Sequence, residues 1–406
     1  MNDSTLLALE ADSSQVAPLP FTKLMPIRYQ ELSEAVAGFE RTGIPLVSVR
    51  GDSLIPTVAA DDSGMYYLAS KLAVTFHISA AAAWDVFFFL MLIPSFAIGF
   101  VGTMKVLETQ VAKVFYAVMF AILLVTVYLS GDIYALSPSL VILIVPYLIR
   151  FSKSDSKPSP IHWILLLLFG IIVMLAHVIR AHSATAIVLV FGVLFFFEKR
   201  WNLREKLLSL LAIGIGLLVV FMFFNARYAE RNAYLAKLQP NYVVPPQAHP
   251  FWHNVYIGFG FLDNDYGIRY QDEIGFKKAK EISPTVFIYG EEYERILRDE
   301  TLSLIKKNPL FVIRTLSAKA GVIGFYLLLF MNIGLFCALR YGLNWQLEIA
   351  LLSGMAFNAL PGMLAVPYIP YLTGSFAMAV IYGAMQLDHA LKRGFLKFPK
   401  LKTGSN

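Results

Sequence analysis

Long apolar runs separated by short polar stretches dominate the chain from residue 81 onward. A helix needs about 20 mostly apolar residues to cross the hydrocarbon core of a bilayer, and there it satisfies its own backbone hydrogen bonds. The pattern predicts about nine such helices, some of them short and joined in tight hairpins. They span residues 81–104, 115–130, 133–149, 161–179, 183–197, 207–224, 320–339, 346–365 and 367–387.

The composition supports a membrane protein. The 406 residues are 57% hydrophobic, 14% aromatic and 15% charged, whereas average soluble proteins are about 25% charged. The one cysteine, Cys337, excludes an internal disulfide and a zinc site built on paired cysteines.

The positions of Lys and Arg orient these helices, because short cytoplasmic loops collect basic residues. With residues 1–80 placed outside, the inner loops and tail hold about fifteen Lys and Arg, and the short outer loops hold one, Arg180. The net charge of +6 is therefore a signal of topology and not of nucleic-acid binding. We expect a bacterial inner (plasma) membrane location with the large loops extracytoplasmic.

Five regions follow from this pattern in an all-α polytopic membrane protein. They are an extracytoplasmic N-terminal segment with an acidic loop and an interfacial helix (1–80), a six-helix transmembrane region (81–224), a large extracytoplasmic loop (225–319), a three-helix transmembrane region (320–387) and a basic cytoplasmic tail (388–406). No leader precedes the outer N-terminal segment in this sequence, so we expect a first transmembrane helix upstream of Met1.

The N-terminal segment carries a candidate base. Gly and Pro predict a loop up to about residue 59, with Asp52 in it, and a helix begins at Asp61 or Asp62. A carboxylate at an outer helix start, beside Tyr66 and Tyr67, suits the removal of a proton from a sugar hydroxyl. The alternative is that these aspartates only cap a helix on the membrane surface.

The residues from Asp62 to Tyr67 form an Asp-x-Gly-x-Tyr-Tyr motif, which resembles the first outer loop of GT-C fold glycosyltransferases. A later Ile-x-x-Asn-Pro segment, residues 305–309, is similar to one found in many of these proteins. The resemblance implies a GT-C-like fold, a sugar donor on a polyprenyl phosphate and a catalytic carboxylate, for which Asp62 and Asp61 match the position. Asp52, Tyr66 and Tyr67 are then expected to contact substrate. The family's helix before this loop is not in this sequence.

The second polar segment is rich in aromatic residues, glycine and histidine around residues 249–270. Aromatic faces pack on the apolar faces of sugars, so Trp252 and His253 are predicted to bind the acceptor. His249 and His253 have the spacing of a helical metal pair, but Pro250 and the lack of a third ligand argue against it. Asp263-Asn264-Asp265 fits a divalent-metal motif less well than an Asx turn. No cofactor is predicted with certainty, and a divalent metal ion stays open.

The tight outer hairpins carry the last candidates. Arg180 is placed where positive charge is disfavoured, and a guanidinium is suited to bidentate phosphate contacts, so Arg180 and His182 are predicted to bind the donor phosphate. The alternative for Arg180 is snorkelling to lipid headgroups. Asp132, in the neighbouring hairpin, is expected to pair with Arg180, to support a metal or to end two helices in water.

Three functions remain open. The leading hypothesis is an inverting membrane glycosyltransferase in cell-envelope glycan assembly, which moves a sugar from a polyprenyl-phosphate carrier to a glycan, lipid or protein acceptor. The second is an O-antigen polymerase or ligase, whose chemistry depends on outer Arg and His. The third is a non-enzymatic transporter or assembly scaffold. Loss of activity on neutralising Asp61 and Asp62 separates the first from the second.

The orientation makes a direct prediction. On a Cys337→Ser background, an impermeant thiol reagent applied to intact cells should label Ser283→Cys in the large outer loop and leave Ser154→Cys in an inner loop unlabelled. Labelling of Ser154→Cys without labelling of Ser283→Cys contradicts the orientation.

Overall fold

The computed structural model describes residues 22, 24–57, 63–153, 159–180, 183–199, 201–240, 242–244 and 250–394. The described chain is almost entirely helical, with one two-stranded sheet. In chain order its elements are α2 (Pro26–Thr42), β1 (Val47–Arg50), β2 (Ser53–Pro56), α3 (Ser63–Phe76), α4 (Ala80–Val106), α5 (Gln110–Ser130), the 3-10 helix η2 (Ile133–Leu136), α6 (Ser137–Lys153), α7 (Pro160–Ile179), α8 (Thr185–Phe196), α9 (Leu203–Leu238), α10 (Phe251–Gly258), the 3-10 helix η3 (Phe259–Phe261), α11 (Asp272–Ile282), α12 (Glu291–Lys307), α13 (Pro309–Met331), α14 (Ile333–Tyr341), α15 (Trp345–Leu364) and α16 (Ile369–Lys392).

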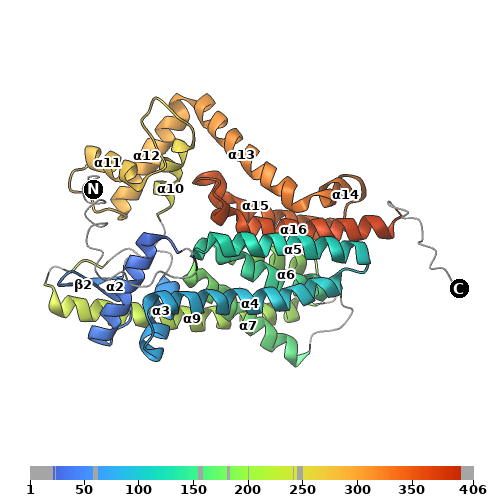
Figure 1. Ribbon diagram of the computed structural model, residues 1–406, viewed down its shortest axis with the longest axis horizontal. Coiled ribbons are helices and arrows are strands. Elements are labelled where there is room, and N and C mark those ends of the chain that lie inside the picture. Colours follow the sequence, from blue (N-terminus) through green and yellow to red (C-terminus); the bar gives the residue numbers. More distant parts are fainter. Residues whose placement is uncertain are drawn as a thin grey trace.

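Most of the long helices run side by side in a bundle (Figure 1). Within the described residues, seven helical stretches are long and apolar enough to cross a membrane: α4, α5, η2 with α6, α7, α9, α13 and α15. Large apolar side chains such as Leu210, Leu211 and Met222 are exposed on α9, as a surface in contact with lipid requires. The prediction of an all-α polytopic membrane protein is confirmed. Two of the expected runs, in α8 and α16, are not among the seven stretches.

The surroundings of the last helix, α16, explain why it is less apolar than a helix that faces lipid. It is packed against α5, α6, α13, α14 and α15, and every residue from Leu372 to Asp388 is buried. Because protein surrounds it, α16 tolerates polar side chains that a lipid-facing helix would not, such as Ser375, whose hydroxyl donates to the Met355 carbonyl at 2.9 Å. The other run is shorter: α8 has 12 residues.

Two glycines allow α7 and α9 to approach each other closely. A Cβ added at Gly170 would lie 2.2 Å from the Ile213 carbonyl oxygen, and one at Gly216 would lie 2.2 Å from that of Leu167. Small residues at a crossing let helix backbones touch, and van der Waals contact then replaces the hydrophobic effect that lipid does not provide. This packing places the C-terminal end of α7, where Arg180 is the capping residue.

The N-terminal segment is more ordered than the sequence predicted. The helix expected after Asp61 or Asp62 is α3, described from Ser63, but the expected loop before residue 59 contains a β-hairpin instead, in which Arg50 pairs with Ser53. The loop prediction was wrong here because Gly51 and Asp52 form a two-residue hairpin turn between two strand-forming stretches. Asp52 is exposed in that turn.

Both large polar segments lie at one end of the bundle, and α16 ends at the other (Figure 1). The predicted boundaries at residues 224 and 320 both fall inside continuous helices. α9 extends to Leu238, because helix-forming residues follow its apolar part, and the Gln239 side chain then donates to the Leu54 carbonyl of β2 at 2.6 Å. α13 begins at Pro309, where the Asn308 side chain caps it.

Helices α10, α11 and α12 form a lobe at this end with a hydrophobic core of its own. Helix α12 is amphipathic, and its apolar face packs inside this lobe. Its buried side chains include Tyr293, Ile296 and Leu297. We call α10–α12 the outer lobe, because it projects from the bundle.

Candidate functional site

A cavity of about 280 Å³ lies where the outer lobe meets the bundle. Its wall comes from η2, the end of α7, one face of α10, the end of α15 and the start of α16. Most of the lining is apolar, and the charged side chain in it is that of Arg180. The lining residues are Tyr134, Arg180, Phe251, Asn254, Val255, Phe357, Leu360, Pro361, Leu364, Ala365 and Tyr371.

Two guanidinium groups meet at one tyrosine beside this cavity. The Cζ atom of Arg180 lies 3.8 Å from the centroid of the Tyr134 ring, and that of Arg28 lies 4.6 Å from it. Arg28 also donates to the Tyr134 hydroxyl at 2.5 Å. A tyrosine face attracts cations, so Tyr134 holds together two positive groups that would otherwise repel each other.

Asp132 balances one of these charges. Its carboxylate is buried, with the residue 3% exposed, and lies 3.7 Å from the Arg28 Nε. Burial raises the pKa of this carboxyl, while the charges of Arg28 and Arg180 oppose the rise. Two guanidinium groups and one carboxylate thus lie together beside the cavity, and a guanidinium is suited to pair with an anionic group. Of the three alternatives for Asp132, one was an ion pair with Arg180; the ion pair that the structure shows is with Arg28.

Tyrosines from the outer lobe and the bundle meet at the same place. The rings of Tyr134 and Tyr371 are 4.8 Å apart and nearly perpendicular, and the Tyr371 hydroxyl lies 3.3 Å from that of Tyr270. Burial raises the pKa of the Tyr270 hydroxyl. It therefore stays protonated near neutral pH and can donate a hydrogen bond.

The segment that follows the predicted base lies against the end of α7. A Cβ added at Gly64 would come within 2.7 Å of the backbone of Val178, two residues before Arg180, and the Ser63 hydroxyl bonds with the Tyr228 hydroxyl. The chain directly after Asp61 and Asp62 is thus packed beside the chain directly before Arg180. Asp61, Asp62 and His182 themselves lie outside the described residues.

The structure does not bring the predicted tyrosines of α3 to the cavity. Tyr66 is fully buried and its hydroxyl donates to the Glu31 carboxylate of α2. The Tyr67 ring lies edge-on to those of Phe223 and Phe224, with centroids 5.6 and 5.5 Å away. Both tyrosines hold α3 in place, and Asp52 lies apart in its hairpin turn.

The predicted acceptor residues on α10 also have positioning roles. His253 is 3% exposed, with its Nδ1 2.5 Å from the Tyr293 hydroxyl and its Nε2 3.2 Å from the Asp272 carboxylate. The Glu294 carboxylate accepts from the backbone N–H groups of Trp252 and His253 at 2.7 and 3.1 Å. These bonds fix the helix so that its other face, with Phe251 and Asn254, lines the cavity.

The Asp263–Asp265 stretch forms the expected Asx turn. The Asn264 side chain accepts from the N–H groups of Tyr266 and Ile268 and donates to the Leu262 and Ile268 carbonyls. Among the residues that the structure describes, no three His, Cys, Asp or Glu side chains are grouped so as to hold a metal ion.

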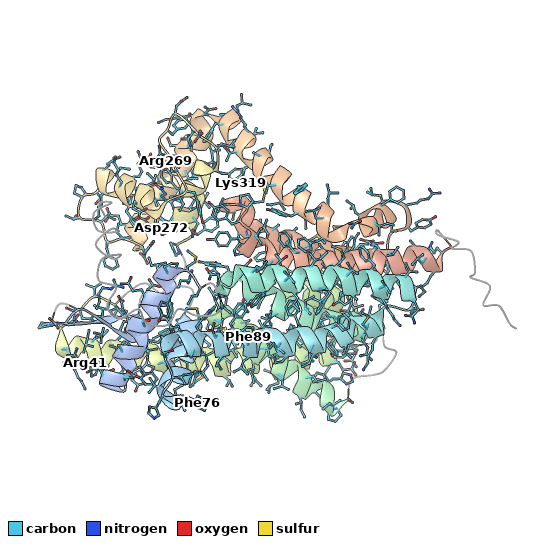
Figure 2. All side chains as sticks on the ribbon, viewed as in Figure 1. Arg41, Phe76, Phe89, Arg269, Asp272 and Lys319 are labelled. Atoms are coloured by element: carbon cyan, nitrogen blue, oxygen red, sulfur yellow. The ribbon has the colours of Figure 1, made fainter. Side chains whose placement is uncertain are left out.

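A buried lysine fixes the far wall of the cavity. Lys319 of α13 is 1% exposed, and its ammonium donates to the carbonyls of Met363, Leu364 and Ala365 at 3.1, 3.3 and 2.6 Å. These are carbonyls at the C-terminal end of α15, where a cation is favoured. Figure 2 shows Lys319 where α13 leaves the outer lobe and approaches the bundle. Lys319 thereby ties the lobe to the two cavity-lining residues Leu364 and Ala365.

No family model, curated protein or solved structure matches this chain.

The sequence pattern singled out Arg180 but missed its neighbours. Arg28, Tyr134 and Tyr371 come from segments far apart in the chain, so no local spacing connects them. Lys319 gave a usable signal, a basic residue directly before a long apolar run, since an ionisable residue within a membrane helix marks a functional or structural role. The sequence prediction began the corresponding membrane helix at residue 320 and so placed Lys319 outside it.

We expect the hydrogen bonds of the Lys319 ammonium to contribute clearly to the free energy of unfolding. Lys319→Met leaves three helix-end carbonyls without their donor, at a cost of about 1.5–3 kcal/mol for a lost charged hydrogen bond. We expect a clearly lower thermal unfolding midpoint in detergent than for Lys306→Met, which removes an exposed cation from α12. Equal midpoints for the two variants contradict this role.

Proposed function

We propose that this protein is a membrane glycosyltransferase that moves a sugar from a polyprenyl-phosphate carrier to an acceptor at the outer face of the membrane. The observation that carries the proposal is the position of Arg180, whose guanidinium lines an apolar cavity at the end of the bundle that bears both polar segments. A lipid-linked donor carries both a phosphate and an apolar chain. Arg180 is suited to bind the phosphate, and the apolar lining of the cavity is suited to contact the chain.

The guanidinium groups support an anionic ligand. Arg28 and Arg180 lie together on Tyr134, and the apolar wall of the cavity strengthens the attraction of Arg180 for a phosphate. A guanidinium offers two parallel N–H groups to phosphate oxygens. The cavity volume of about 280 Å³ lies at the lower end of ligand pockets, which suits the polar end of a carrier lipid better than its whole length.

The chemistry is a single displacement at the anomeric carbon. A base takes the proton of the acceptor hydroxyl as its oxygen forms the new bond to that carbon. The bond from the anomeric carbon to the phosphate oxygen breaks, and the electron pair leaves with the polyprenyl phosphate. The anomeric centre is inverted. Arg180 stabilises the charge that grows on the leaving phosphate, which is where fixed positive groups contribute most.

The base in this proposal is Asp62 or Asp61. The support is the packing of Ser63 and Gly64, the residues that follow them, against the end of α7 next to Arg180. The acceptor approaches along the face of α10 that bears Asn254, below the outer lobe. A bacterial inner membrane, with the outer lobe extracytoplasmic, is the location that the Lys and Arg distribution favours.

An O-antigen polymerase or ligase is the second candidate. It is favoured by the pair of guanidinium groups on Tyr134, since its chemistry depends on outer Arg residues rather than on a carboxylate. The two candidates give opposite results when the aspartates are neutralised.

The first prediction concerns the donor. Arg180→Lys loses bidentate geometry and Arg180→Ala also loses the charge, so donor affinity should fall in that order, by about 1.5–3 kcal/mol for the alanine variant. Turnover should fall as well, because the phosphate is the leaving group. Binding and turnover of a synthetic polyprenyl-phosphate sugar in nanodiscs measure both effects. Arg295→Ala, an exposed site in the outer lobe, is the control. If the Arg180→Lys variant is fully active, the side chain of Arg180 only reaches the lipid headgroups and does not bind the donor phosphate.

The second prediction concerns the base. Asn in place of the catalytic aspartate should lower turnover by about 10²–10⁴-fold while donor binding is retained. Asp52→Asn, in the exposed hairpin turn, is a matched control in the same segment and should be fully active. Full activity of Asp61→Asn, Asp62→Asn and the double variant removes both residues from the mechanism. If Arg180→Ala is inactive at the same time, the polymerase or ligase function is favoured.

A further inference from the structure

The cavity at the outer lobe, which we call the outer cavity, contains a tyrosine beside Arg180. Tyr371 lies in the first turn of α16 and lines the same wall of about 280 Å³ of space as Arg180 does. Both side chains contact Tyr134: the Arg180 Cζ atom lies 3.8 Å, and the centroid of the Tyr371 ring 4.8 Å, from the centroid of its ring. The charge of Arg180 acts on the Tyr371 hydroxyl. A ligand that meets the guanidinium therefore also meets this hydroxyl.

The hydroxyl of Tyr371 has one hydrogen-bond partner among the residues that the structure describes. This partner is the hydroxyl of Tyr270, at 3.3 Å, which is long for a pair of hydroxyl groups. Each hydroxyl carries one hydrogen, and a bond between the two uses only one of them. The other hydrogen has no acceptor in the described part of the chain. Since Tyr371 lines the cavity and Tyr270 does not, an acceptor in the cavity can take the hydrogen of Tyr371.

Phosphate is the ligand chemistry that suits these groups. The cavity wall is mostly apolar, and Arg180 is the charged side chain in it. A hydroxyl that donates to an anionic oxygen makes a shorter and stronger bond than one that donates to a neutral group. Burial raises the pKa of the Tyr270 hydroxyl, so this group keeps its proton and donates to Tyr371 when Tyr371 donates to the ligand. The two bonds then strengthen each other.

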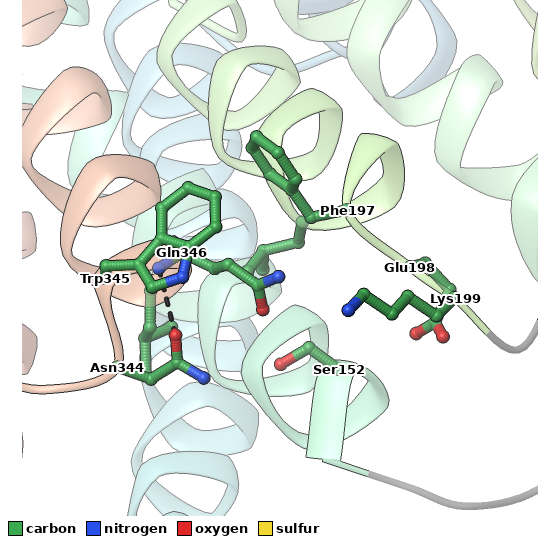
Figure 3. A pocket seen from close by; sticks show the side chains of 9 residues that line it. Ser152, Phe197, Glu198, Lys199, Asn344, Trp345 and Gln346 are labelled. Carbon is green, nitrogen blue, oxygen red and sulfur yellow. Dashed lines mark hydrogen bonds between the residues drawn. The ribbon is translucent and has the colours of Figure 1, made fainter.

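The second cavity of the bundle shows a hydroxyl that the protein itself uses. This cavity, of about 630 Å³, lies at the other end of α15, where α6 and α8 end and α15 begins (Figure 3). The hydroxyl in its wall belongs to Ser152, which donates to the Ile149 carbonyl of its own helix at 2.8 Å. The hydrogen of Ser152 is thus already bound, whereas that of Tyr371 is available to a ligand.

We propose that the Tyr371 hydroxyl binds the donor phosphate together with Arg180, and that Tyr270 is its positioning residue. This phosphate is that of the polyprenyl carrier, so the role of Tyr371 rests on the proposed function. Tyr371 donates to a phosphate oxygen, and Tyr270 donates to the Tyr371 oxygen. The bond from Tyr371 strengthens as negative charge grows on the leaving phosphate. Because Tyr270 directly precedes the outer lobe helix α11, the lobe contributes to this site without touching the donor.

The experiment uses two probes that differ only in the phosphate, farnesyl phosphate and farnesol. Their binding to the full chain in nanodiscs is measured by isothermal titration calorimetry, and the wild-type chain should prefer farnesyl phosphate. Tyr371→Phe removes the hydroxyl and keeps the ring, so it should weaken the binding of farnesyl phosphate about tenfold and leave that of farnesol unchanged. Tyr270→Phe should weaken it by a few-fold. In the Tyr371→Phe background it should have no further effect, because Tyr270 acts through Tyr371.

Tyr368→Phe is the matched control. Tyr368 directly precedes α16, and its ring is nearly parallel to that of Tyr371 with centroids 6.5 Å apart, but it does not line the cavity. This variant should bind farnesyl phosphate as the wild-type chain does. Equal losses for Tyr368→Phe and Tyr371→Phe overturn the role of Tyr371. The same conclusion follows if Tyr371→Phe weakens the binding of both probes equally, since its hydroxyl would then act on packing and not on phosphate.

Arg180→Ala separates this failure from a failure of the proposed function. If the wild-type chain prefers farnesyl phosphate, and Arg180→Ala abolishes this preference while Tyr371→Phe does not reduce it, the cavity binds the phosphate without Tyr371. If the wild-type chain binds the two probes equally, the cavity has no phosphate site, and the proposed function and the role of Tyr371 fail together.

Discussion

The low polarity of the bilayer interior is the constraint on which this structure depends. Within the hydrocarbon core every backbone donor and acceptor needs a partner in the protein, so the chain crosses as helices. Charged side chains are expensive there, and most of them lie at the two ends of the bundle. Both cavities are found at these ends. Ligands that combine a charged group with an apolar chain are the natural occupants of such positions.

Two charged side chains near the ends of α15 have partners in the protein. Lys319 donates to carbonyls at the end of α15, and Glu348 accepts from the Tyr382 hydroxyl at 2.6 Å and the Gln386 amide at 2.5 Å. These bonds connect α13 and α16 to α15. Since α15 lines the outer cavity with its last turn and the second cavity with its first, its placement determines the shape of both.

The outer site depends on tertiary packing in a different way. Tyr134 has no special chemistry by itself, but it lies between Arg28 and Arg180, and it joins the N-terminal segment to the hairpin after α7. The outer lobe reaches the same place through Tyr270 and the cavity-lining face of α10. Three regions of the chain thus meet at one largely apolar site that contains two guanidinium groups.

Much of the fold could be predicted from the sequence, because hydrophobicity over a long run is a local property. Arg180 was singled out as an exception to the charge bias, and the structure places it at the cavity. The roles of Tyr66, Tyr67 and His253 could not be predicted, since an aromatic residue in a polar segment serves equally well in a binding surface and in a buried contact. Arg28 and Tyr134 are 106 positions apart in the chain, so only the packing of α2 on the bundle shows that they are neighbours.

The central claim is that the outer cavity binds the phosphate end of a polyprenyl carrier. The most direct test is photolabelling of the protein in nanodiscs with a polyprenyl phosphate that carries a photoreactive group in its first isoprene unit, followed by peptide mapping. The account predicts labelling of the end of α15 or the start of α16, at residues such as Leu364 and Tyr371, and its suppression by unlabelled polyprenyl phosphate. Labelling confined to the lipid-facing surface of α9, or labelling that unlabelled carrier does not suppress, would contradict it.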